Sequence, residues 1–381
     1  MSEWQEVKLG ELVDIGSSKR IFYEDYVNVG IPFYRSKEVI EKYNGNDIST
    51  DLFITKEKFE QIKEKYGAPQ TGDLLLTSVG TLGIPYIVQE GEEFYFKDGN
   101  LTWFKNYKSN LYNEFLYYWI ISPIGKNALD MMSIGSTQAA LTIQGLKNLD
   151  FDVPPIEEQK AIASVLSSLD DKIDLLHRQN TTLECMAETL FRQWFVEEAQ
   201  EDWVLHKLGD CVTISYGKNL PTKNLLDDGF PVFGANGQIG FYDRYTYDEP
   251  QVLVSCRGEA SGKVNVSLPK SYVTNNSLVL EQNKIPEISF EFLKYWALSY
   301  DFDLHVSGSA QPQITIDGLY GADFTVPPKK LIEKFTETVN GLETKKLNNF
   351  FQIKTLEKLR DNLLPKLMSG EVRVDLEGAA A

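Results

Sequence analysis

Cysteine and histidine are scarce in this chain of 381 residues, which contains three of each. The cysteines, Cys185, Cys211 and Cys256, lie far apart in the sequence, and the histidines do not follow the spacing of metal ligands. A small, odd number of cysteines argues against a disulfide framework and is typical of a reducing compartment. We therefore expect a cytoplasmic protein with no metal site.

Long hydrophobic runs are also missing. The sequence has no stretch of eighteen consecutive apolar residues, and residues 1–10 are polar. A helix that spans a bilayer needs about 20 predominantly apolar residues, and a secretory signal needs an apolar central region. We therefore expect no association with a membrane.

Positive charge is in short supply, because 38 Lys and Arg residues face 55 Asp and Glu residues, for a net charge of −17. Residues 1–150 hold 15 basic and 21 acidic side chains, and residues 200–326 hold 9 and 16. Domains that bind nucleic acid are usually basic. Any contact with DNA must therefore use a locally positive surface, or a partner protein must neutralise most of the phosphates.

Recognisable catalytic motifs are missing as well. The Pro-Pro pairs at 154–155 and 327–328 follow valine, whereas the motif of adenine and cytosine methyltransferases has Asn or Asp there. Residues 258–264 are one residue short of a phosphate-binding loop and end in valine, where such a loop needs Ser or Thr to hold magnesium. Asp152 with Glu158–Lys160 has too short a spacing for the carboxylate and lysine set of a nuclease. These absences favour a protein that performs no chemistry itself.

What the sequence does contain is an internal repeat. Residues 135–155 align without gaps to residues 308–328, and 12 of the 21 positions are identical. Residues 113–119 resemble residues 290–296 in the same order, and the offset between the copies drifts from 199 to 173 along the chain. Such self-similarity indicates a duplicated structural unit. Two domains with one scaffold and two different targets fit this pattern, although a duplication kept only for stability is an alternative.

Both copies have the composition of mixed domains. Short β-like runs at 73–77 and 252–255 are bounded by Gly and Pro turns. Aromatic-rich segments at 114–121 and 291–298 predict helices that pack into the core.

A long amphipathic helix is predicted after each copy. Apolar residues recur at alternating steps of four and three from Ile162 to Trp194, which is a heptad seam, and a less regular apolar side runs from Phe335 to Leu363. One helix of this length cannot bury its stripe alone, so we expect the two helices to pair. Asn180 within the first seam either sets the register of this pairing or is a tolerated, partly exposed asparagine. The residues expected at the coiled-coil and subunit-docking surface are Ile162, Leu166, Leu169, Ile173, Leu176, Leu183, Leu190, Trp194, Leu342, Ile353, Leu356 and Leu363.

The predicted fold is therefore a pair of pseudo-symmetric, mixed α/β (α+β) globular domains joined by two long antiparallel coiled-coil helices. The predicted boundaries are 1–155 and 200–328 for the domains, 156–199 and 329–372 for the helices, and 373–381 for a C-terminal tail.

This order of domain, helix, domain, helix resembles the specificity subunit of type I restriction–modification enzymes. The resemblance covers essentially the whole chain, and its motifs are specific through their order and duplication. The segments that carry it are Trp4–Gly16, Trp203–Ser215, Gly30–Arg35, the Val-Pro-Pro exits before Glu157–Lys160, and the helix ends at Leu190–Val196 and Leu364–Val372.

The resemblance implies a non-catalytic subunit. Each globular domain would be a target recognition domain for one half of a split, double-stranded DNA sequence. The helices would form the spacer and dock two modification subunits, which would bind S-adenosylmethionine and methylate adenine. Restriction subunits with ATP and magnesium would complete the nuclease, and no cofactor would bind to this chain.

Residues that contact DNA need donors or acceptors presented on loops. Arg35 and Arg257 are candidates for bidentate contacts with guanine, although either one is equally well explained as a phosphate clamp or a structural ion pair. The predicted DNA-binding residues are Lys19, Arg20, Arg35, Lys37, Ser78, Thr81, Ser136 and Gln138 in the first domain, and Lys218, Lys223, Asn236, Gln238, Arg257, Lys263, Ser309 and Gln311 in the second.

The negative charge keeps an alternative open, in which the chain is a non-catalytic, two-headed protein-interaction scaffold without sequence-selective DNA binding. A fragment of a fused restriction enzyme is a third interpretation, against which the missing methylase motifs argue.

Overall fold

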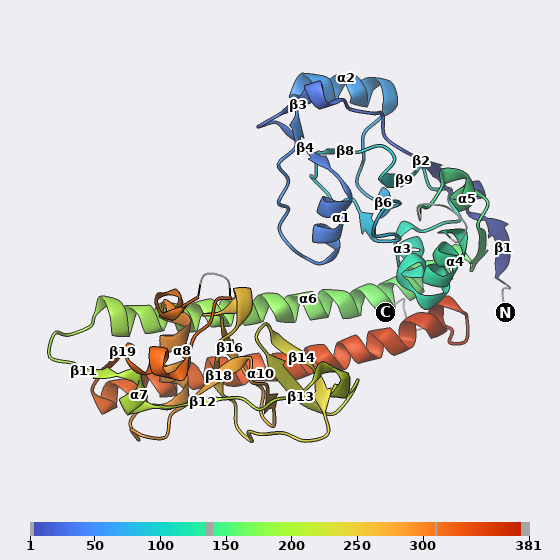
Figure 1. The fold of residues 1–381 in the computed structure, drawn as a ribbon. Coiled ribbons are helices and arrows are strands. Elements are labelled where there is room, and N and C mark those ends of the chain that lie inside the picture. The colour runs from blue at the N-terminus through green and yellow to red at the C-terminus, as the bar shows by residue number, and fades with distance from the viewer. Residues whose placement is uncertain (1–3, 134–139, 309–310, 375–381) are drawn as a thin grey trace. The chain divides into compact units, whose positions relative to one another are not determined.

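The computed structural model describes residues 4–133, 140–308 and 311–374, and these form two compact units (Figure 1). The first unit contains residues 1–174 and 353–381, and the second contains residues 175–352. Each long helix therefore contributes one part to each unit. Within the described segments, no helix combines the length and the apolar character needed to cross a membrane.

The first globular domain runs from β1 to β10 (Gln5–Val153) and contains two four-stranded sheets and a terminal strand pair. The first sheet has the order β2 (Asp14–Gly16), β9 (Leu101–Lys105), β6 (Leu74–Thr77), β7 (Pro85–Ile87). The second has the order β3 (Tyr26–Val27), β5 (Phe53–Ile54), β4 (Ile31–Tyr34), β8 (Tyr95–Phe96). The terminal pair is β1 (Gln5–Lys8) with β10 (Asp150–Val153). The helices are η1 (Leu9–Glu11), η2 (Tyr23–Asp25), α1 (Ser36–Tyr43), α2 (Lys56–Tyr66), α3 (Asn113–Ile121), α4 (Pro123–Ser133) and α5 (Ile143–Lys147).

The second globular domain runs from β11 to β19 (Val204–Val326) and has a four-stranded sheet, a three-stranded sheet and a terminal strand pair. The larger sheet has the order β12 (Thr213–Tyr216), β18 (Ser277–Glu281), β15 (Val252–Ser255), β16 (Val264–Val266). The smaller has the order β14 (Gly237–Tyr242), β13 (Phe230–Gly234), β17 (Tyr272–Val273). The terminal pair is β11 (Val204–Lys207) with β19 (Asp323–Val326). The helices are α7 (Leu208–Cys211), η4 (Thr222–Asn224), η5 (Gly258–Ala260), α8 (Phe290–Ser299), η6 (Phe302–His305) and α9 (Ile316–Tyr320).

The two domains repeat one topology. The order β2-β9-β6-β7 has the same pattern as β12-β18-β15-β16. The parallel pair β4–β8 brings Phe33 opposite Tyr95, and the parallel pair β13–β17 brings Val232 opposite Tyr272. Phe33 and Val232 are 199 residues apart, and Tyr95 and Tyr272 are 177 residues apart. These are the offsets of the weaker similarities between the two copies. The predicted mixed, duplicated fold is therefore confirmed.

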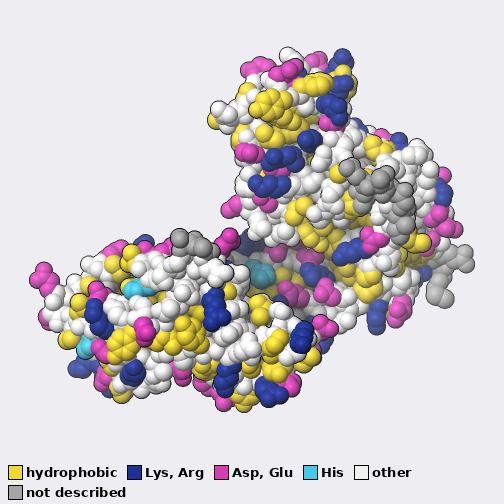
Figure 2. Space-filling view, in the orientation of Figure 1, with side chains coloured by type: hydrophobic (Ala, Val, Ile, Leu, Met, Phe, Trp, Pro, Cys, Tyr) yellow, Lys and Arg dark blue, Asp and Glu magenta, His cyan; other side chains and the backbone are white. Residues whose placement is uncertain are grey.

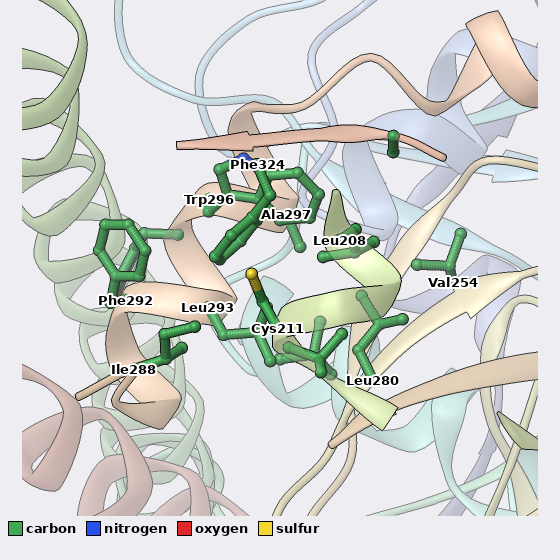
Figure 3. Packing of buried hydrophobic residues seen from close by; sticks show 14 of the residues in the cluster. Leu208, Cys211, Val254, Leu280, Ile288, Phe292, Leu293, Trp296, Ala297 and Phe324 are labelled. Atoms are coloured by element: carbon green, nitrogen blue, oxygen red, sulfur yellow. The ribbon is translucent and has the colours of Figure 1, made fainter. Parts of the chain in front are cut away.

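The core of each domain forms where an aromatic-rich helix, α3 or α8, covers the sheet that contains β6 or β15. In the second domain all four residues of β15 are buried. Val252 and Val254 of this strand share one buried cluster with Phe292, Leu293 and Trp296 of α8. Figure 3 shows the sulfur of Cys211 pointing toward Phe324 and Trp296. Burial raises the pKa of the Cys211 thiol to about 11, so this cysteine acts as a packed apolar side chain.

The long helices are α6 (Ile156–Arg192), which continues into a π-helical turn η3 (Gln193–Glu197), and α10 (Lys329–Met368). In the first unit Ile162 and Leu166 share a buried cluster with Leu364 and Leu367. In the second unit Phe191 of α6 shares a buried cluster with Phe335 of α10. Within each unit an early part of one helix meets a late part of the other, which is an antiparallel pairing, as predicted.

The predicted seam residues differ in exposure. Ile162, Leu166, Ile173, Leu176 and Ile353 are buried. The partly buried ones are Leu169, Leu183, Leu190, Trp194, Leu342, Leu356 and Leu363.

Asn180 contacts the second helix rather than solvent. Asn349, which is fully buried, donates its side-chain amide to the Asn180 carbonyl oxygen over 2.9 Å, and the Asn180 amide faces the Lys346 carbonyl at 3.4 Å. A hydrogen bond between buried amides of two helices forms in one register only. The structure therefore favours the register role of Asn180 over the alternative of a tolerated residue.

Candidate nucleic-acid interface

Lys19 and Lys218 lie at equivalent places, 199 residues apart, on exposed loops that follow β2 and β12. The Lys19 backbone N–H donates to the Tyr95 hydroxyl over 2.7 Å. In the second domain the Tyr272 hydroxyl donates to the Asn219 carbonyl over 3.2 Å. Each loop is thus anchored to a tyrosine of β8 or β17, which leaves the lysine side chain outside.

Arg20 is exposed and forms an ion pair of 2.9 Å with Asp98. The Lys19 ammonium lies 5.3 Å from the centre of the Tyr66 ring. Lys223, in the short helix η4 of the second domain, is exposed. All three predicted residues are therefore accessible, and the Arg20 guanidinium would have to share its charge between Asp98 and a phosphate.

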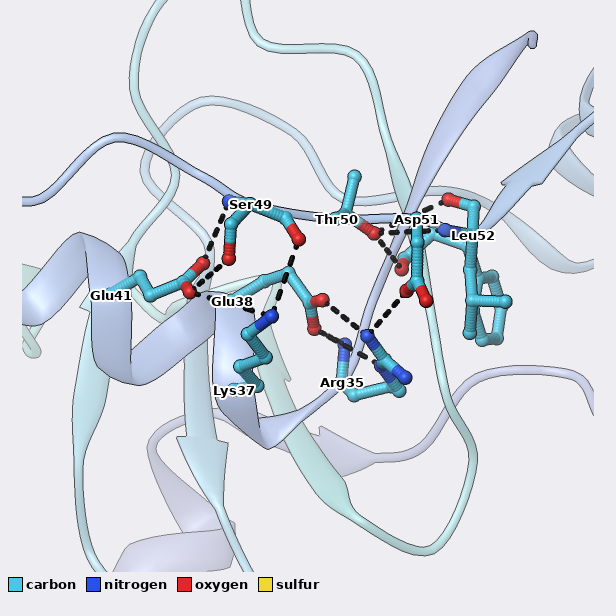
Figure 4. Close-up of polar contacts among 9 residues, drawn as sticks. Arg35, Lys37, Glu38, Glu41, Ser49, Thr50, Asp51 and Leu52 are labelled. Carbon is cyan, nitrogen blue, oxygen red and sulfur yellow. Dashed lines mark hydrogen bonds and ion pairs between the residues drawn. The ribbon is translucent and has the colours of Figure 1, made fainter. Parts of the chain in front are cut away.

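Arg35 is held by two carboxylates at the start of α1 (Figure 4). Its guanidinium lies 2.8 Å from an oxygen of Glu38 and 2.9 Å from an oxygen of Asp51, and the Glu38 side chain is fully buried. Its backbone N–H also donates to Glu38, over 2.7 Å. The hydrogen bond with Glu38 raises the pKa of Arg35 against the effect of partial burial. Removing this cation would leave the buried Glu38 carboxylate without a positively charged partner. The geometry therefore favours the structural ion pair over the guanine contact.

The other predicted residues of the first domain differ in accessibility. Lys37 is exposed and reaches the Ser49 carbonyl at 3.3 Å, and Thr81 is exposed on the turn after β6. Ser78 is buried, with its hydroxyl 2.6 Å from that of Thr102. DNA cannot reach this hydroxyl without a rearrangement of the strand ends.

In the second domain, Asn236 and Gln238 are exposed on the β13–β14 hairpin. Asn236 and Lys263 line one polar hollow of about 560 Å³, together with acidic side chains such as Glu259 and Asp303. The structure thus brings two predicted residues together from separate loops. The surrounding carboxylates make this hollow better suited to hydrogen-bond donors, such as base amino groups, than to phosphates.

Arg257 and Gln311 are exposed on neighbouring segments of the second domain, since the backbone of Arg257 pairs with Gln313. The remaining predicted residues, Ser136, Gln138 and Ser309, lie outside the described residues.

In Figure 2, basic and acidic side chains are interspersed over the visible face. On this face, therefore, neither sign of charge forms a continuous surface.

A buried polar junction joins the second domain to the long helices. Lys294 of α8 is 5% exposed, and its ammonium lies 2.8 Å from Glu343 of α10 and 3.5 Å from Glu184 of α6. The hydroxyl of Tyr295 also donates to Glu343. One carboxylate thus accepts from two side chains of the domain's core helix.

The first domain has a related junction. The Tyr118 hydroxyl of α3 donates to Asp170 of α6 over 2.9 Å, and Arg360 of α10 lies 2.9 Å from the other oxygen of Asp170. Burial, followed by the nearby Asp170, raises the pKa of Tyr118. Asp170 and Glu343 are 173 residues apart, which is the offset of the strongest part of the repeat. Both tyrosine–carboxylate contacts are therefore parts of the repeated scaffold.

The comparison with family models accounts for this duplicated plan. The model of the type I restriction modification DNA specificity domain matches residues 1–185 and again residues 200–364. The chain belongs to this family.

Three specificity subunits resemble this chain along nearly its whole length. The MjaIX specificity subunit of a type I restriction enzyme from Methanocaldococcus jannaschii is 27% identical, over 98% of this chain and 94% of its own length. The HindI specificity subunit from Haemophilus influenzae is 22% identical, over 98% of this chain and 100% of its own length. The crystal structure of the type I S subunit from M. genitalium has the same fold, with a TM-score of 0.62 at 21% identity and 96% coverage of both chains.

The chain is therefore a type I specificity subunit with two target recognition domains, as the resemblance implied. Specificity subunits are not enzymes, which agrees with the interpretation drawn from the missing motifs. The comparisons give no support to the alternative of a protein-interaction scaffold.

Sequence reasoning missed the buried junction around Lys294. The only signal was a lysine within the otherwise apolar and aromatic segment 290–298. A charged residue at such a place, opposite acidic residues on both long helices, predicts a buried ion pair once the helices are known to pack there. Among the described residues, no group of three or more His, Cys, Asp and Glu side chains is arranged to hold a metal ion.

Proposed function

We propose that this specificity subunit selects a bipartite double-stranded DNA target for a type I restriction–modification complex. Each globular domain would read one half-site, and the paired helices would set the distance between the half-sites. The observation that carries this proposal is one scaffold in two copies with different exposed side chains, such as Lys19-Arg20 in one loop and Lys218-Asn219 in the other. A split, asymmetric target requires two DNA-reading surfaces that share a scaffold and differ in their side chains.

The proposal extends to two modification subunits, one for each repeat. Large apolar side chains of the long helices remain exposed, including Leu175 and Met186 of α6 and Leu347 and Leu359 of α10. Exposed apolar side chains on paired helices are typical of surfaces that another protein covers. Partners that surround the DNA would also supply the phosphate contacts that a chain of net charge −17 provides poorly.

The chemistry would lie on the partners. We assign S-adenosylmethionine to the modification subunits, and ATP and magnesium to restriction subunits. The chain's three free cysteines are in keeping with work in the reducing cytoplasm.

The test is to map N6-methyladenine on DNA treated with the chain assembled with its modification subunits. The expected result is methylation within a split sequence whose two specified parts are separated by a fixed number of unspecified bases. The modification subunits without this chain serve as the control and should methylate no specific sequence. Methylation of a continuous, unsplit sequence would contradict the proposal.

A further inference from the structure

One exposed position has the same backbone contacts in both domains. Its side chain is apolar in the first domain and positively charged in the second. In the first domain it is Val79, which follows β6 and is 37% exposed. The preceding residue, Ser78, donates its N–H to Asn100 over 2.8 Å and accepts from the Leu141 N–H over 3.0 Å. Val79 itself forms an isolated antiparallel bridge with Ala140. These contacts fix the direction of the chain at this point.

The second domain repeats this setting around Arg257. The preceding residue, Cys256, donates its N–H to Asn276 over 2.9 Å and accepts from the Ile314 N–H over 3.1 Å. Arg257 forms an isolated antiparallel bridge with Gln313. The hydrogen-bond partners match those of the first domain one by one.

The next residue is a glycine with positive φ in both domains, Gly80 at 81° and Gly258 at 74°. L-residues with side chains rarely adopt this conformation. The strand therefore ends in the same turn in both copies. Val79 and Arg257 are thus structural equivalents, although a valine and an arginine have little in common in sequence comparison.

The Arg257 side chain is exposed. The other arginines of the two globular domains each contact a carboxylate: Arg20 contacts Asp98, Arg35 contacts Glu38, and Arg244 contacts Asp243. Within the described segments, the Arg257 guanidinium has no ion pair or hydrogen bond. All of its N–H donors are therefore available to a ligand.

The chemistry of the two side chains points to base recognition. A free guanidinium matches the O6 and N7 acceptors of guanine in the major groove with two parallel hydrogen bonds. A small apolar side chain matches the C5-methyl group of thymine. Equivalent positions with these two side chains would specify different bases at matching places of the two half-sites.

We propose that position 79/257 is a specificity-determining position of each target recognition domain, with Arg257 contacting a guanine and Val79 contacting a thymine methyl group. This inference rests on the proposed function, because it assigns one base of each half-site to one residue. Arg257 differs in this from Arg35, whose guanidinium is occupied by Glu38 and Asp51.

The test uses the assembled methyltransferase and a DNA library in which every base of the bipartite target is varied. The variant Arg257→Gln is expected to lose its preference for guanine at one base pair of one half-site by roughly 10- to 100-fold. The preferences at the other positions should stay. The variant Val79→Arg is expected to replace a thymine preference by a guanine preference at the matching base pair of the other half-site.

The matched control is Arg244→Gln, since Arg244 is exposed on the same domain but paired with Asp243. It should leave the methylated sequence unchanged. Equal melting temperatures of the variant chains exclude misfolding as a cause.

Four results would overturn the inference. A uniform decrease of methylation for all sequences by Arg257→Gln, with a smaller dependence on salt, would identify a phosphate contact. An unchanged sequence preference for Val79→Arg would show that position 79 does not face a base. A wild-type complex without any bipartite preference would refute the proposed function and this inference with it, whereas an Arg257→Gln complex that keeps the wild-type guanine preference at every base pair would refute the inference alone.

Discussion

At the scale of single residues, the structure separates side chains that hold the fold from side chains that are free to bind. Arg35 and Arg257 look alike in sequence, but Arg35 contacts a fully buried carboxylate and Arg257 contacts none among the described residues. Likewise, Ser78 is buried while Thr81, three residues later, is exposed. The sequence could therefore name the residue types of a DNA interface but not their availability, because availability depends on partners that are distant in the chain.

Removing Lys294 is expected to be costly. Its ammonium contacts Glu184 and Glu343, and both carboxylates also contact Lys346. We expect Lys294→Met to lower the free energy of unfolding by roughly 1–3 kcal/mol, because Glu343 loses a buried donor and keeps only Lys346 and Tyr295 as partners. Equilibrium unfolding of the full chain in urea measures the change.

The control for this prediction is Lys330→Met on the exposed start of α10. Substitutions at such surface positions usually change stability by no more than about 0.5 kcal/mol. A Lys294→Met chain as stable as this control would show that the junction does not depend on the lysine.

At the scale of elements, the long helices were the most predictable feature and the loops of the first domain the least. Heptad spacing places apolar residues on one side of a helix whatever the surroundings, and both helices were found where expected. The helices α1 and α2 were not predicted. They lie between β4 and β6, where the offset between the copies falls from 199 at Phe33–Val232 to 178 at Leu74–Val252. The drift in the offset thus marked an insertion but not its structure, because short helices of polar residues have weak periodicity.

The amide pair between the two helices gives a prediction at this scale. Asn349→Leu leaves the side-chain carbonyl oxygen of the partly buried Asn180 without its donor, and we expect a loss of about 1–3 kcal/mol in the free energy of unfolding. Changing both residues to leucine should recover most of this loss, because an apolar pair needs no hydrogen bond. Urea unfolding of the two single variants and the double variant forms a double-mutant cycle.

Asn348→Leu is the matched control, since Asn348 is adjacent and exposed. A double variant in which the two losses simply add would show that the amides are not coupled, and the role of Asn180 in setting the register would then be wrong.

At the scale of the whole molecule, the negative charge and the family membership have to be reconciled. A net charge of −17 repels DNA at long range, yet each target recognition domain presents exposed lysines and arginines on its loops. Under the proposed function, base recognition rests on a few residues of this chain and phosphate neutralisation rests on the partners. The sequence could predict this division from charge and duplication, but not which bases are recognised, because that depends on loop conformation.

The central claim is that the two domains read their half-sites independently. It is tested most directly by replacing residues 1–150 with the corresponding domain of another type I specificity subunit and mapping N6-methyladenine after assembly with the same modification subunits. We predict that one half-site changes to that of the donor, while the other half-site and the spacing between them stay the same. A change in both half-sites, or in neither, would contradict the account.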